Sequence, residues 1–228
     1  MSDAGPSFIR QLTPADADAL IAIVRRRAIA KSEHLLHAGA AGDEVMLVLS
    51  GRVKLIAYGN DRREVVIGIR GPGELIGEMA ALGAQRRTAT AVALDDVEVG
   101  LLSAAQLREF LDSRPGAERA LTRVFIRRLT DADRARVDLA TQDSVGRIAA
   151  RLLALADDYG TSVKDGTRIE LPLTQDELAS WTGATRETVS RALRLMRRLG
   201  WIATDHRSIT VLDPDALRER CGGVSARH

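Results

Sequence analysis

The chain has 228 residues, of which 45% are hydrophobic and 28% are charged, and its formal net charge is +2 at pH 7. This length suggests one large domain or two ordinary ones, and the composition is that of a globular protein. Because 33 Lys and Arg nearly balance 31 Asp and Glu, the total charge indicates nothing about a nucleic-acid partner, and only local clusters of basic residues can indicate one.

The single cysteine, Cys221, excludes an intrachain disulfide and a metal cluster held by several cysteines of this chain. This usage fits a reducing compartment. No apolar run approaches the roughly 20 residues that span a bilayer. Residues 1–10 lack the charged and apolar regions of a signal peptide. The sequence therefore predicts a cytoplasmic protein with no membrane partner.

The N-terminal half begins with a predicted helix and continues with predicted strands. Thr13 can cap a helix over residues 13–27, with Pro14 at its first position. The apolar face of this helix would consist of Leu20, Ile23 and Val24. Short β-prone runs split by glycine turns follow at 45–51, 52–59, 64–69, 88–94 and 97–102. Runs of this length and spacing predict a small jelly-roll barrel, and its interior can hold a ligand.

A long helix is predicted for residues 113–140. Pro115 suits its first turn, and no Gly or Pro follows Gly116 until Gly146. A near-heptad rhythm is formed by Leu121, Phe125, Leu129, Ala132, Arg136 and Leu139. A long helix with one apolar stripe favours a homodimer, although the same helix could instead pack across its own barrel.

Residues 173–202, LTQDELASWTGATRETVSRALRLMRRLGWI, have the pattern of a helix-turn-helix. Thr174 can cap the first helix through a T-x-x-E box with Glu177. Gly183 supplies the turn, and Thr185 can cap the second helix. This second helix would direct Val189, Leu193 and Met196 toward the core.

The opposite face of the second helix is basic. Glu187, Ser190, Arg191 and Arg194 recur at helical spacing, and Arg186 joins them in the first turn. Arg can donate twice to the O6 and N7 atoms of guanine, and Glu can accept from the amino group of cytosine. The pattern favours a helix that reads the major groove, and the alternative is an ordinary solvated basic face. The candidate DNA-binding residues are Thr174, Gln175, Thr185, Arg186, Glu187, Ser190 and Arg191.

Further elements flank this motif. Asp143 can cap a helix over 144–158, and a polar loop is expected at 160–166. Residues 201–212 have the pattern of a β-hairpin, which would give a winged form of the motif. The tail from Arg218 is basic, and we expect it to be frayed.

The stretch GPGELIGEMAALGAQRRTATAVA, residues 71–93, combines a glycine-rich turn, a short helix and an arginine that precedes a strand. Backbone N–H groups after Gly77 can bind an anion, as helix N-termini do. Arg87 can make a bidentate contact to a phosphate, and the Glu78 carboxylate can accept from a sugar hydroxyl. Together these groups indicate a nucleotide site. The alternative is a buried salt bridge between Glu78 and Arg87 that stabilises an empty barrel.

The chain resembles the cAMP receptor protein and fumarate–nitrate regulator family of bacterial transcription factors. IGEM at 76–79 with QRRTAT at 85–90 resembles the family's phosphate-binding cassette, and RETVSR at 186–191 resembles its recognition helix. The order of cassette, long helix, VGRIAAR helix at 145–151 and winged helix-turn-helix matches over nearly the whole chain.

The resemblance implies an α+β fold with an N-terminal cyclic-nucleotide-binding β jelly-roll, a long dimerisation helix and a C-terminal winged helix-turn-helix. We expect the barrel domain at 1–112, the dimerisation helix and hinge at 113–142, and the DNA-binding domain at 143–228. The implied function is a homodimeric transcription regulator, not an enzyme, that binds palindromic double-stranded DNA with TGTGA-like half-sites. The set Glu187, Ser190 and Arg191 also resembles readers of TTGAT-like sites, and relatives touch RNA polymerase near residues 160–166.

The resemblance also implies roles for the cassette residues. Gly77 and Glu78 would hold the ribose and phosphate, Arg87 would neutralise the cyclic phosphate, and Thr88 would bond the phosphate or the base. The long helix would close over the base. The candidate ligand-binding residues are Gly77, Glu78, Met79, Arg87, Thr88 and Asp133.

One departure bears on the effector. At two positions of the long helix where cAMP-responsive members offer adjacent hydroxyl or amide side chains, this sequence has Ala132 and Asp133. Ala132 cannot bond a base, whereas an ionised Asp133 accepts from the adenine amino group or from guanine N1 and N2. The R-T-A sequence around Thr88 also occurs in cGMP-binding relatives. The expected effector is a 3′,5′-cyclic nucleotide, cAMP ahead of cGMP, and the alternatives are another ligand or constitutive DNA binding.

The sequence leaves two further alternatives to compare with a transcription regulator that lacks a metal site. The barrel could regulate a kinase or channel, but the second domain has no Gly-rich nucleotide loop, catalytic-triad spacing or membrane span. His34 and His37 lie three apart in a β-prone stretch, with no Cys or paired carboxylate close in sequence. We expect them to be ordinary surface residues rather than haem or metal ligands, so no metal site is predicted.

Overall fold

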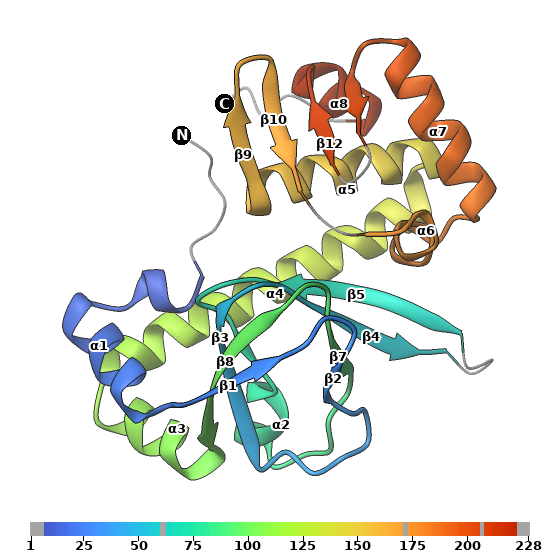
Figure 1. Cartoon of the computed structure of the whole chain (residues 1–228). Coiled ribbons are helices and arrows are strands. Elements are labelled where there is room, and N and C mark those ends of the chain that lie inside the picture. The colour runs from blue at the N-terminus through green and yellow to red at the C-terminus, as the bar shows by residue number, and fades with distance from the viewer. Residues whose placement is uncertain (1–6, 60–62, 171–172, 206–207, 223–228) are drawn as a thin grey trace. The chain divides into compact units, whose positions relative to one another are not determined.

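The computed structural model describes residues 7–59, 63–170, 173–205 and 208–222, and the chain divides into two compact units (Figure 1). The first unit is Pro6–Asp131, and the second consists chiefly of Ala132–His228. The helix α4 (Pro115–Thr141) begins in the first unit and ends in the second. None of the described helices has the length and hydrophobicity that a membrane span requires.

The first unit is a two-sheet β-roll, as the sequence predicted. Its described strands form antiparallel sheets in the orders β1-β8-β3-β6 and β2-β7-β4-β5. The strands are β1 (Arg25–Ile29), β2 (His34–Leu36), β3 (Glu44–Ser50), β4 (Val53–Tyr58), β5 (Glu64–Arg70), β6 (Leu75–Ile76), β7 (Thr90–Ala93) and β8 (Val97–Ser103). The helical elements are η1 (Ile9–Gln11), α1 (Pro14–Ile23), α2 (Glu78–Gly83), α3 (Ala104–Asp112) and the first part of α4.

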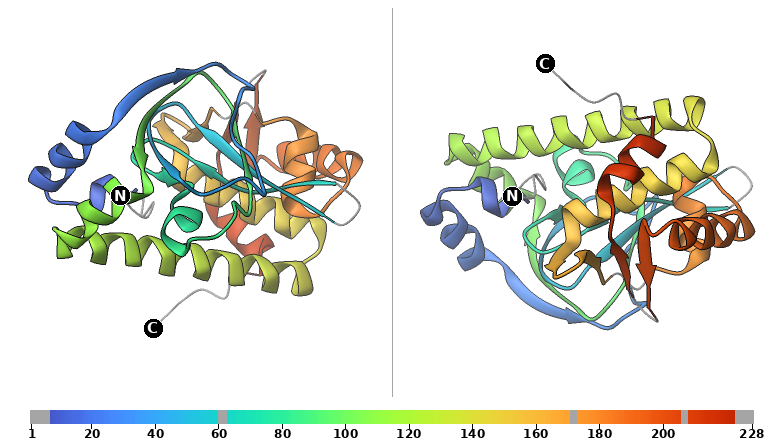
Figure 2. Two further views of the ribbon diagram at one scale, coloured as in Figure 1. Left: turned by 90° about the horizontal axis from the view of Figure 1, so that it is seen from below. Right: turned by 90° about the horizontal axis from the view of Figure 1, so that it is seen from above.

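Strand β3 supplies side chains to both faces of its sheet. Met46 and Val48 face the other sheet and pack in one core with Val53, Ile76, Ala91 and Val99. Val45 and Leu47 belong to a second core with Leu107, Phe110, Ala117, Ala120, Leu121 and Val124, which lie on α3 and α4. A strand buried on both faces is hydrophobic at every position rather than at alternate ones, which explains the run VMLVL. Figure 2 shows α4 passing alongside α2 on this helical side.

The predicted helix over residues 13–27 is too long. Thr13 caps α1 as expected, by accepting from the Asp16 N–H, but the helix ends at Ile23. Residues 25–29 form β1, which pairs with β8 from Arg25 opposite Leu101 onward. Sheet pairing with a distant segment therefore overrides the helical tendency of the Arg-rich run. Of the predicted apolar face, only Leu20 is fully buried.

The second unit is a winged helix-turn-helix. Helix α5 (Ser144–Tyr159) is capped by Asp143 as predicted, and α6 (Gln175–Thr182), α7 (Arg186–Arg198) and α8 (Pro214–Arg220) follow. The described strands form one antiparallel sheet in the order β11-β12-β10-β9. The strands are β9 (Gly160–Val163), β10 (Gly166–Ile169), β11 (Ile202–Thr204) and β12 (Ile209–Val211). The predicted hairpin at 201–212 is thus present, and its residues 206 and 207 lie outside the described residues.

Two expectations for this unit were wrong. The polar loop predicted at 160–166 is a hairpin, because β9 and β10 pair from Gly160 opposite Ile169 to Val163 opposite Gly166. Residues 161–163 are all exposed, so the sequence of this strand shows no alternation of apolar and polar residues. The tail is not frayed at Arg218, since α8 continues to Arg220 and buries Leu217. Residues 223–228 lie outside the described residues.

Leu47 on β3 is fully buried between the sheet and the helices. Leu47→Ala should therefore lower the free energy of unfolding by about 2–5 kcal/mol, through lost burial and the cavity left behind. The matched control is Ile67→Ala on β5, where 51% of the residue is exposed, and its expected loss is below about 1 kcal/mol. Denaturant unfolding measures both, and equal losses would contradict this description of the core.

Candidate effector site and nucleic-acid interface

The cassette begins at Gly77, between β6 and α2. Gly77 has φ +83°, a left-handed conformation that L side chains rarely adopt. A Cβ at this position would also collide with Nη1 of Arg87. Glycine is thus required both by the turn and by the approach of the guanidinium. Because α2 has only six residues, side-chain and local amide groups must supply most of any anion binding here.

Arg87 is buried and only partly satisfied. It is 8% exposed, and its Nη2 donates to the main-chain carbonyl of Glu44 at 2.7 Å. Its backbone N–H donates to Ala40, and its carbonyl accepts from Gly39. Within the described part of the chain, Nη1 is buried with no hydrogen-bond partner, and Arg87 forms no ion pair.

The charge on Arg87 is retained despite its burial. Burial lowers the pKa of Arg87, while Glu44, Asp43 and Glu78 oppose that shift. Because a guanidinium does not lose its proton in a protein, the side chain is a buried cation with one unsatisfied donor beside the Gly77 turn. Such a group provides a site for an anion.

The carboxylate of Glu78 is paired with Arg128 of α4, not with Arg87. Glu78 is 3% exposed, and its Oε1 accepts from Nη1 of Arg128 at 2.6 Å. Arg128 Nη2 also donates to the Leu75 carbonyl at 3.1 Å. The alternative of a Glu78–Arg87 salt bridge is therefore wrong. The cassette and α4 are instead joined by a buried, charge-assisted hydrogen bond.

Sequence reasoning missed Arg128, although one signal could have found it. Arg128 lies seven residues after Leu121 and four after Val124, both of which are buried on α4. It therefore occupies the inward face of the helix, where a charged residue needs a partner. The sequence alone could not indicate which carboxylate that partner is.

A second carboxylate lies beside Arg128. Oε1 of Glu74 is 3.7 Å from Nη2 of Arg128 and 3.7 Å from Nε of Arg70, the last residue of β5. The Glu74 Oε2 atom accepts from the Gly71 N–H at 2.8 Å. Burial lowers the pKa of Arg128, and the nearby Arg70 lowers it further, while Glu78 and Glu74 oppose both effects. In this nearly buried network, positive and negative side chains alternate in the order Arg70, Glu74, Arg128 and Glu78.

The structure places the other predicted ligand residues as follows. Met79 and Thr88 lie within the cassette and are exposed. Ala132 and Asp133 lie on the part of α4 that belongs to the second unit, where Asp133 is exposed and pairs with Arg136 at 2.7 Å. The contact between Asp133 and a nucleotide base therefore stays a prediction.

The helix-turn-helix is built as its caps predicted. Thr174 and Glu177 form the reciprocal capping box of α6, and Thr185 caps α7 by accepting from the Thr188 N–H. Gly183 ends α6 with φ +62°. The buried face of α7 consists of Val189, Ala192, Leu193 and Met196. These contacts fix which face of α7 remains for a partner.

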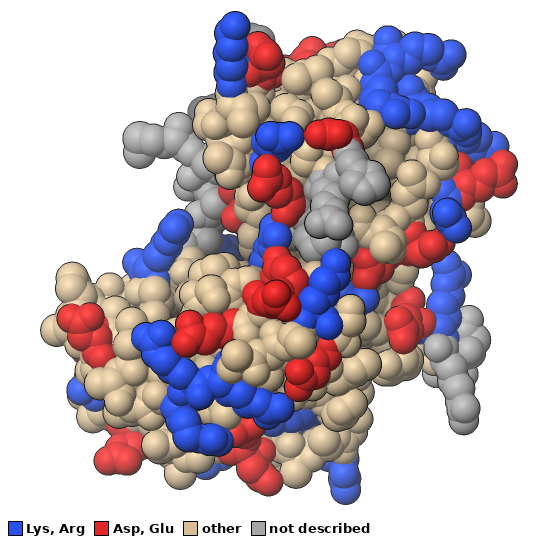
Figure 3. Space-filling view, viewed as in Figure 1, with Lys and Arg blue, Asp and Glu red and all other residues tan. Residues whose placement is uncertain are grey.

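The remaining face of α7 carries the predicted readers. Arg186, Glu187 and Arg191 are exposed, and Ser190 is half-buried. Arg186 lies 3.7 Å from Asp176, and both side chains are about 70% exposed, so this pair is weak and leaves the guanidinium available. In Figure 3, basic side chains gather over the surface that α7 occupies in Figure 1.

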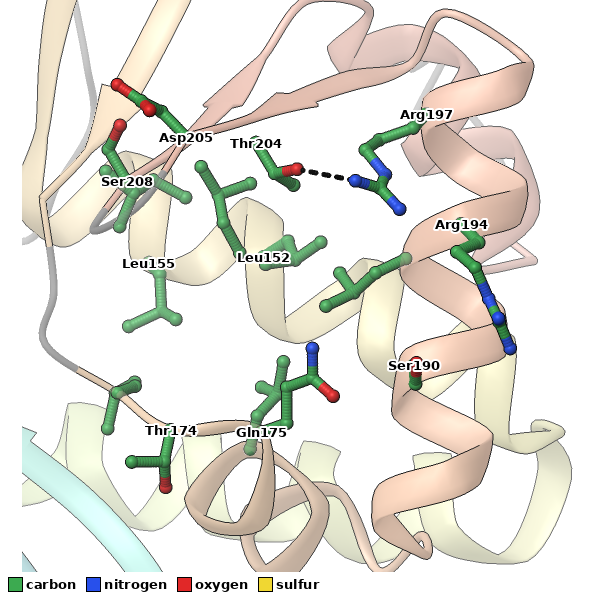
Figure 4. Close-up of a pocket in the computed structure, with 15 residues that line it drawn as sticks. Leu152, Leu155, Thr174, Gln175, Ser190, Arg194, Arg197, Thr204, Asp205 and Ser208 are labelled. Carbon is green, nitrogen blue, oxygen red and sulfur yellow. Dashed lines mark hydrogen bonds between the residues drawn. The ribbon is translucent and has the colours of Figure 1, made fainter.

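A groove of about 510 Å³ lies between α6, α7 and the wing (Figure 4). Thr174 and Gln175 border it at the start of α6, and Ser190 borders it on α7. Arg197 of α7 donates to the Thr204 hydroxyl of β11 at 3.1 Å, which links the helix to the wing. Three of the predicted DNA-binding residues thus border one groove.

Among the described residues, no group of three or more His, Cys, Asp or Glu could hold a metal ion. His34 and His37 are exposed, and their rings stack with centroids 5.3 Å apart.

Comparisons with known protein families match one family domain in each of the two units. The family described as "Cyclic nucleotide-binding domain" matches residues 26–114, and the family described as "Crp-like helix-turn-helix domain" matches residues 146–220. The CRP-like cAMP-activated global transcriptional regulator of Mycobacterium tuberculosis is 34% identical over 80% of this chain and 81% of that protein. The cyclic AMP receptor protein of Thermus thermophilus is 28% identical over 97% of this chain and 99% of that protein.

Among solved structures, the c-di-GMP responsive global regulator CLP of Xanthomonas campestris matches with a TM-score of 0.73 and 25% identity. The match covers 87% of this chain and 99% of that one. The Mycobacterium tuberculosis and Xanthomonas campestris proteins are both named as global regulators.

The Glu78–Arg128 pair gives a test of the site. Arg128→Met leaves a buried carboxylate without its partner and should lower the free energy of unfolding by about 3–5 kcal/mol. The double variant Arg128→Met/Glu78→Gln removes both charges and should lose clearly less. Denaturant unfolding at neutral pH measures the cycle, and a double variant as unstable as the single one would contradict the pairing.

Proposed function

The chain belongs to the cAMP receptor protein and fumarate–nitrate regulator family of DNA-binding transcription regulators, and we propose that it is a homodimer controlled by a 3′,5′-cyclic nucleotide. cAMP is proposed ahead of cGMP. Under this proposal the nucleotide binds the first unit, and the second unit reads a palindromic operator in the cytoplasm.

The observation that carries the effector proposal is the unsatisfied guanidinium of Arg87. A buried cation with an unpartnered donor favours an anion that can accept a hydrogen bond. Nη1 of Arg87 lies beside Gly77, where the main chain has no Cβ to fill the space. Arg87 would neutralise the cyclic phosphate there, and Gly77 would allow the phosphate to approach the backbone.

The sugar and base would be held by neighbouring groups. Glu78 would accept a hydrogen bond from the ribose 2′-hydroxyl while Arg128 keeps it ionised and oriented. Thr88 would bond the phosphate or base, and Met79 would border the ligand. Asp133 would accept from the adenine amino group, since an ionised carboxylate is an acceptor and the neighbouring Ala132 has no polar side chain.

Exposed apolar residues on α4 support the homodimer. These residues are Ile126, Leu129, Val137 and Leu139. A helix that leaves such residues uncovered can bury them against its symmetry mate. Two recognition helices related by a two-fold axis then reach successive major grooves about 34 Å apart, which requires a palindromic site.

Arg186, Glu187, Ser190 and Arg191 would read each half-site, with TGTGA-like sequences proposed ahead of TTGAT-like ones. Thr174, Gln175 and Thr185 would contact the phosphate backbone or base edges from the helix starts. The hairpin of β9 and β10 would offer its tip to RNA polymerase, because Lys164 and Asp165 are exposed there.

Calorimetric titration with cAMP, and separately with cGMP, tests the effector proposal. The wild-type protein should bind one of the two nucleotides with a dissociation constant in the micromolar range or below. Arg87→Ala should weaken that binding by roughly 10–100-fold, as expected for a lost hydrogen bond to a charged group. The control is Arg86→Ala, since the neighbouring Arg86 is exposed and donates to the Gly39 carbonyl. It should bind nearly as wild type.

Failure of wild type to bind either nucleotide would overturn the effector proposal. The working alternative would then be a different effector or constitutive DNA binding by the free protein.

Selection from random DNA tests the operator proposal and should return a two-fold repeat. Arg186→Ala should weaken binding to the selected site by roughly 5–150-fold, because one bidentate base contact is worth about 1–3 kcal/mol. The control is Arg218→Ala on α8, which removes the same charge from outside the reading face. A selected site without two-fold symmetry would refute the homodimeric mode of binding.

A further inference from the structure

Arg70, Glu74, Glu78 and Arg128 form a largely buried network of ion pairs in the first unit. Arg87 is also buried, and Glu78 is the member of the network that acts on it, so the network and Arg87 form a group of five charges. The side chains of Arg70, Glu74 and Arg128 are 17%, 12% and 16% exposed. Two of the three arginines have carboxylate partners, since Glu74 lies between Arg70 and Arg128, and Glu78 accepts from Arg128.

The group therefore has one positive charge in excess, and that charge is on Arg87. Arg87 is the member without an ion pair among the described residues, and its Nη1 is the donor beside Gly77. Glu44 and Asp43 act on Arg87 more strongly than Glu78 does, but Glu44 is half-buried and Asp43 is exposed, so water and salt screen their effect on a ligand. Among the buried charges of this group, Arg87 is therefore the cation that a singly charged anionic ligand would neutralise.

We propose that Glu74, paired with Arg70, is a specificity-determining residue that makes the site select singly charged phosphate diesters over doubly charged phosphate monoesters. This inference rests on the proposed nucleotide site. A cyclic nucleotide carries one negative charge, whereas a 5′-monophosphate carries about −1.5 to −2 at pH 7, because its second pKa is near 6. The single excess positive charge of the site balances the charge of a cyclic nucleotide but is smaller than the charge of a 5′-monophosphate.

Glu74 exerts this effect without touching the ligand. Its Oε2 is occupied by the Gly71 N–H, and its Oε1 faces the two arginines. Electrostatic interaction across a poorly solvated region acts well beyond hydrogen-bond distance. Removing the Glu74 charge leaves Arg70 uncompensated, so the excess of the group becomes two and a dianion is accommodated.

The experiment compares cAMP with 5′-AMP, or cGMP with 5′-GMP if wild type binds cGMP more tightly, by calorimetry and competition at pH 7.5. Wild type should strongly prefer the cyclic form. In Glu74→Gln the preference should fall on the order of tenfold, mainly because the monophosphate binds more tightly. Glu118→Gln is the control, since it removes an exposed charge about 15 Å along α4 from Arg128 and should leave the preference unchanged.

A second pair of variants separates charge from packing. Arg70→Gln/Glu74→Gln restores the excess of one charge without restoring the contacts, so it should regain the wild-type preference. Glu74→Asp keeps the charge and should also retain it. If Glu74→Gln does not fold, Arg70→Gln provides the test from the other side, because it should weaken monophosphate binding more than cyclic nucleotide binding.

The outcomes are distinct. If wild type binds a cyclic nucleotide and Glu74→Gln keeps the same preference, the role of Glu74 is wrong and the proposed function stands. If the double variant fails to regain the preference, the effect of Glu74 is one of packing and the inference is again overturned. If wild type binds neither cyclic nucleotide, both proposals fall together.

Discussion

The buried guanidinium of Arg87 is the constraint on which the first unit depends. Burying a charge without a counter-charge is unfavourable, and the cost must be met by the rest of the fold. Arg87 is nevertheless held in place from several sides, by the Glu44 carbonyl of β3 and by main-chain bonds with Gly39 and Ala40. The two cores that share β3 supply the stability that this arrangement requires. A bound anion would relieve the cost, so ligand binding and barrel stability are linked.

The same site joins the barrel to α4 through Glu78 and Arg128. A ligand that bonds to Glu78 would act on a carboxylate already bonded to the long helix. The exposed apolar residues of that helix continue into the second unit, where Val137 and Leu139 lie. One helix therefore carries the partner of Glu78 at its middle and enters the DNA-binding unit at its C-terminal end.

The sequence predicted elements well where local signals determine them. The capping box of Thr174 and Glu177 and the caps Asp143 and Thr185 act within three residues, and all of them are formed. Strand β1 was missed because its partner, β8, is distant in the sequence, so the Arg-rich run looks helical in isolation. The β9–β10 hairpin was missed because an exposed edge strand needs no apolar alternation.

The candidate site was predictable only in part, because some of its residues are close together in the sequence and others are distant. Gly77, Glu78 and Arg87 stand within one short stretch, and the motif indicated their common location. The partner of Glu78 is 50 residues away on another element, so spacing could not identify it. Only the inward position of Arg128 on a long helix signalled that a buried cation needed a carboxylate, and only the fold shows which one.

A crystal structure of the wild-type protein with cAMP would show whether Arg87 binds the phosphate. We expect a phosphate oxygen within hydrogen-bond distance of Arg87 Nη1, with Nη2 still on the Glu44 carbonyl and Arg128 still on Glu78. A nucleotide bound elsewhere, or Arg87 turned onto the Glu78 carboxylate with no phosphate beside it, would contradict the claim that this cation is the anion-binding centre.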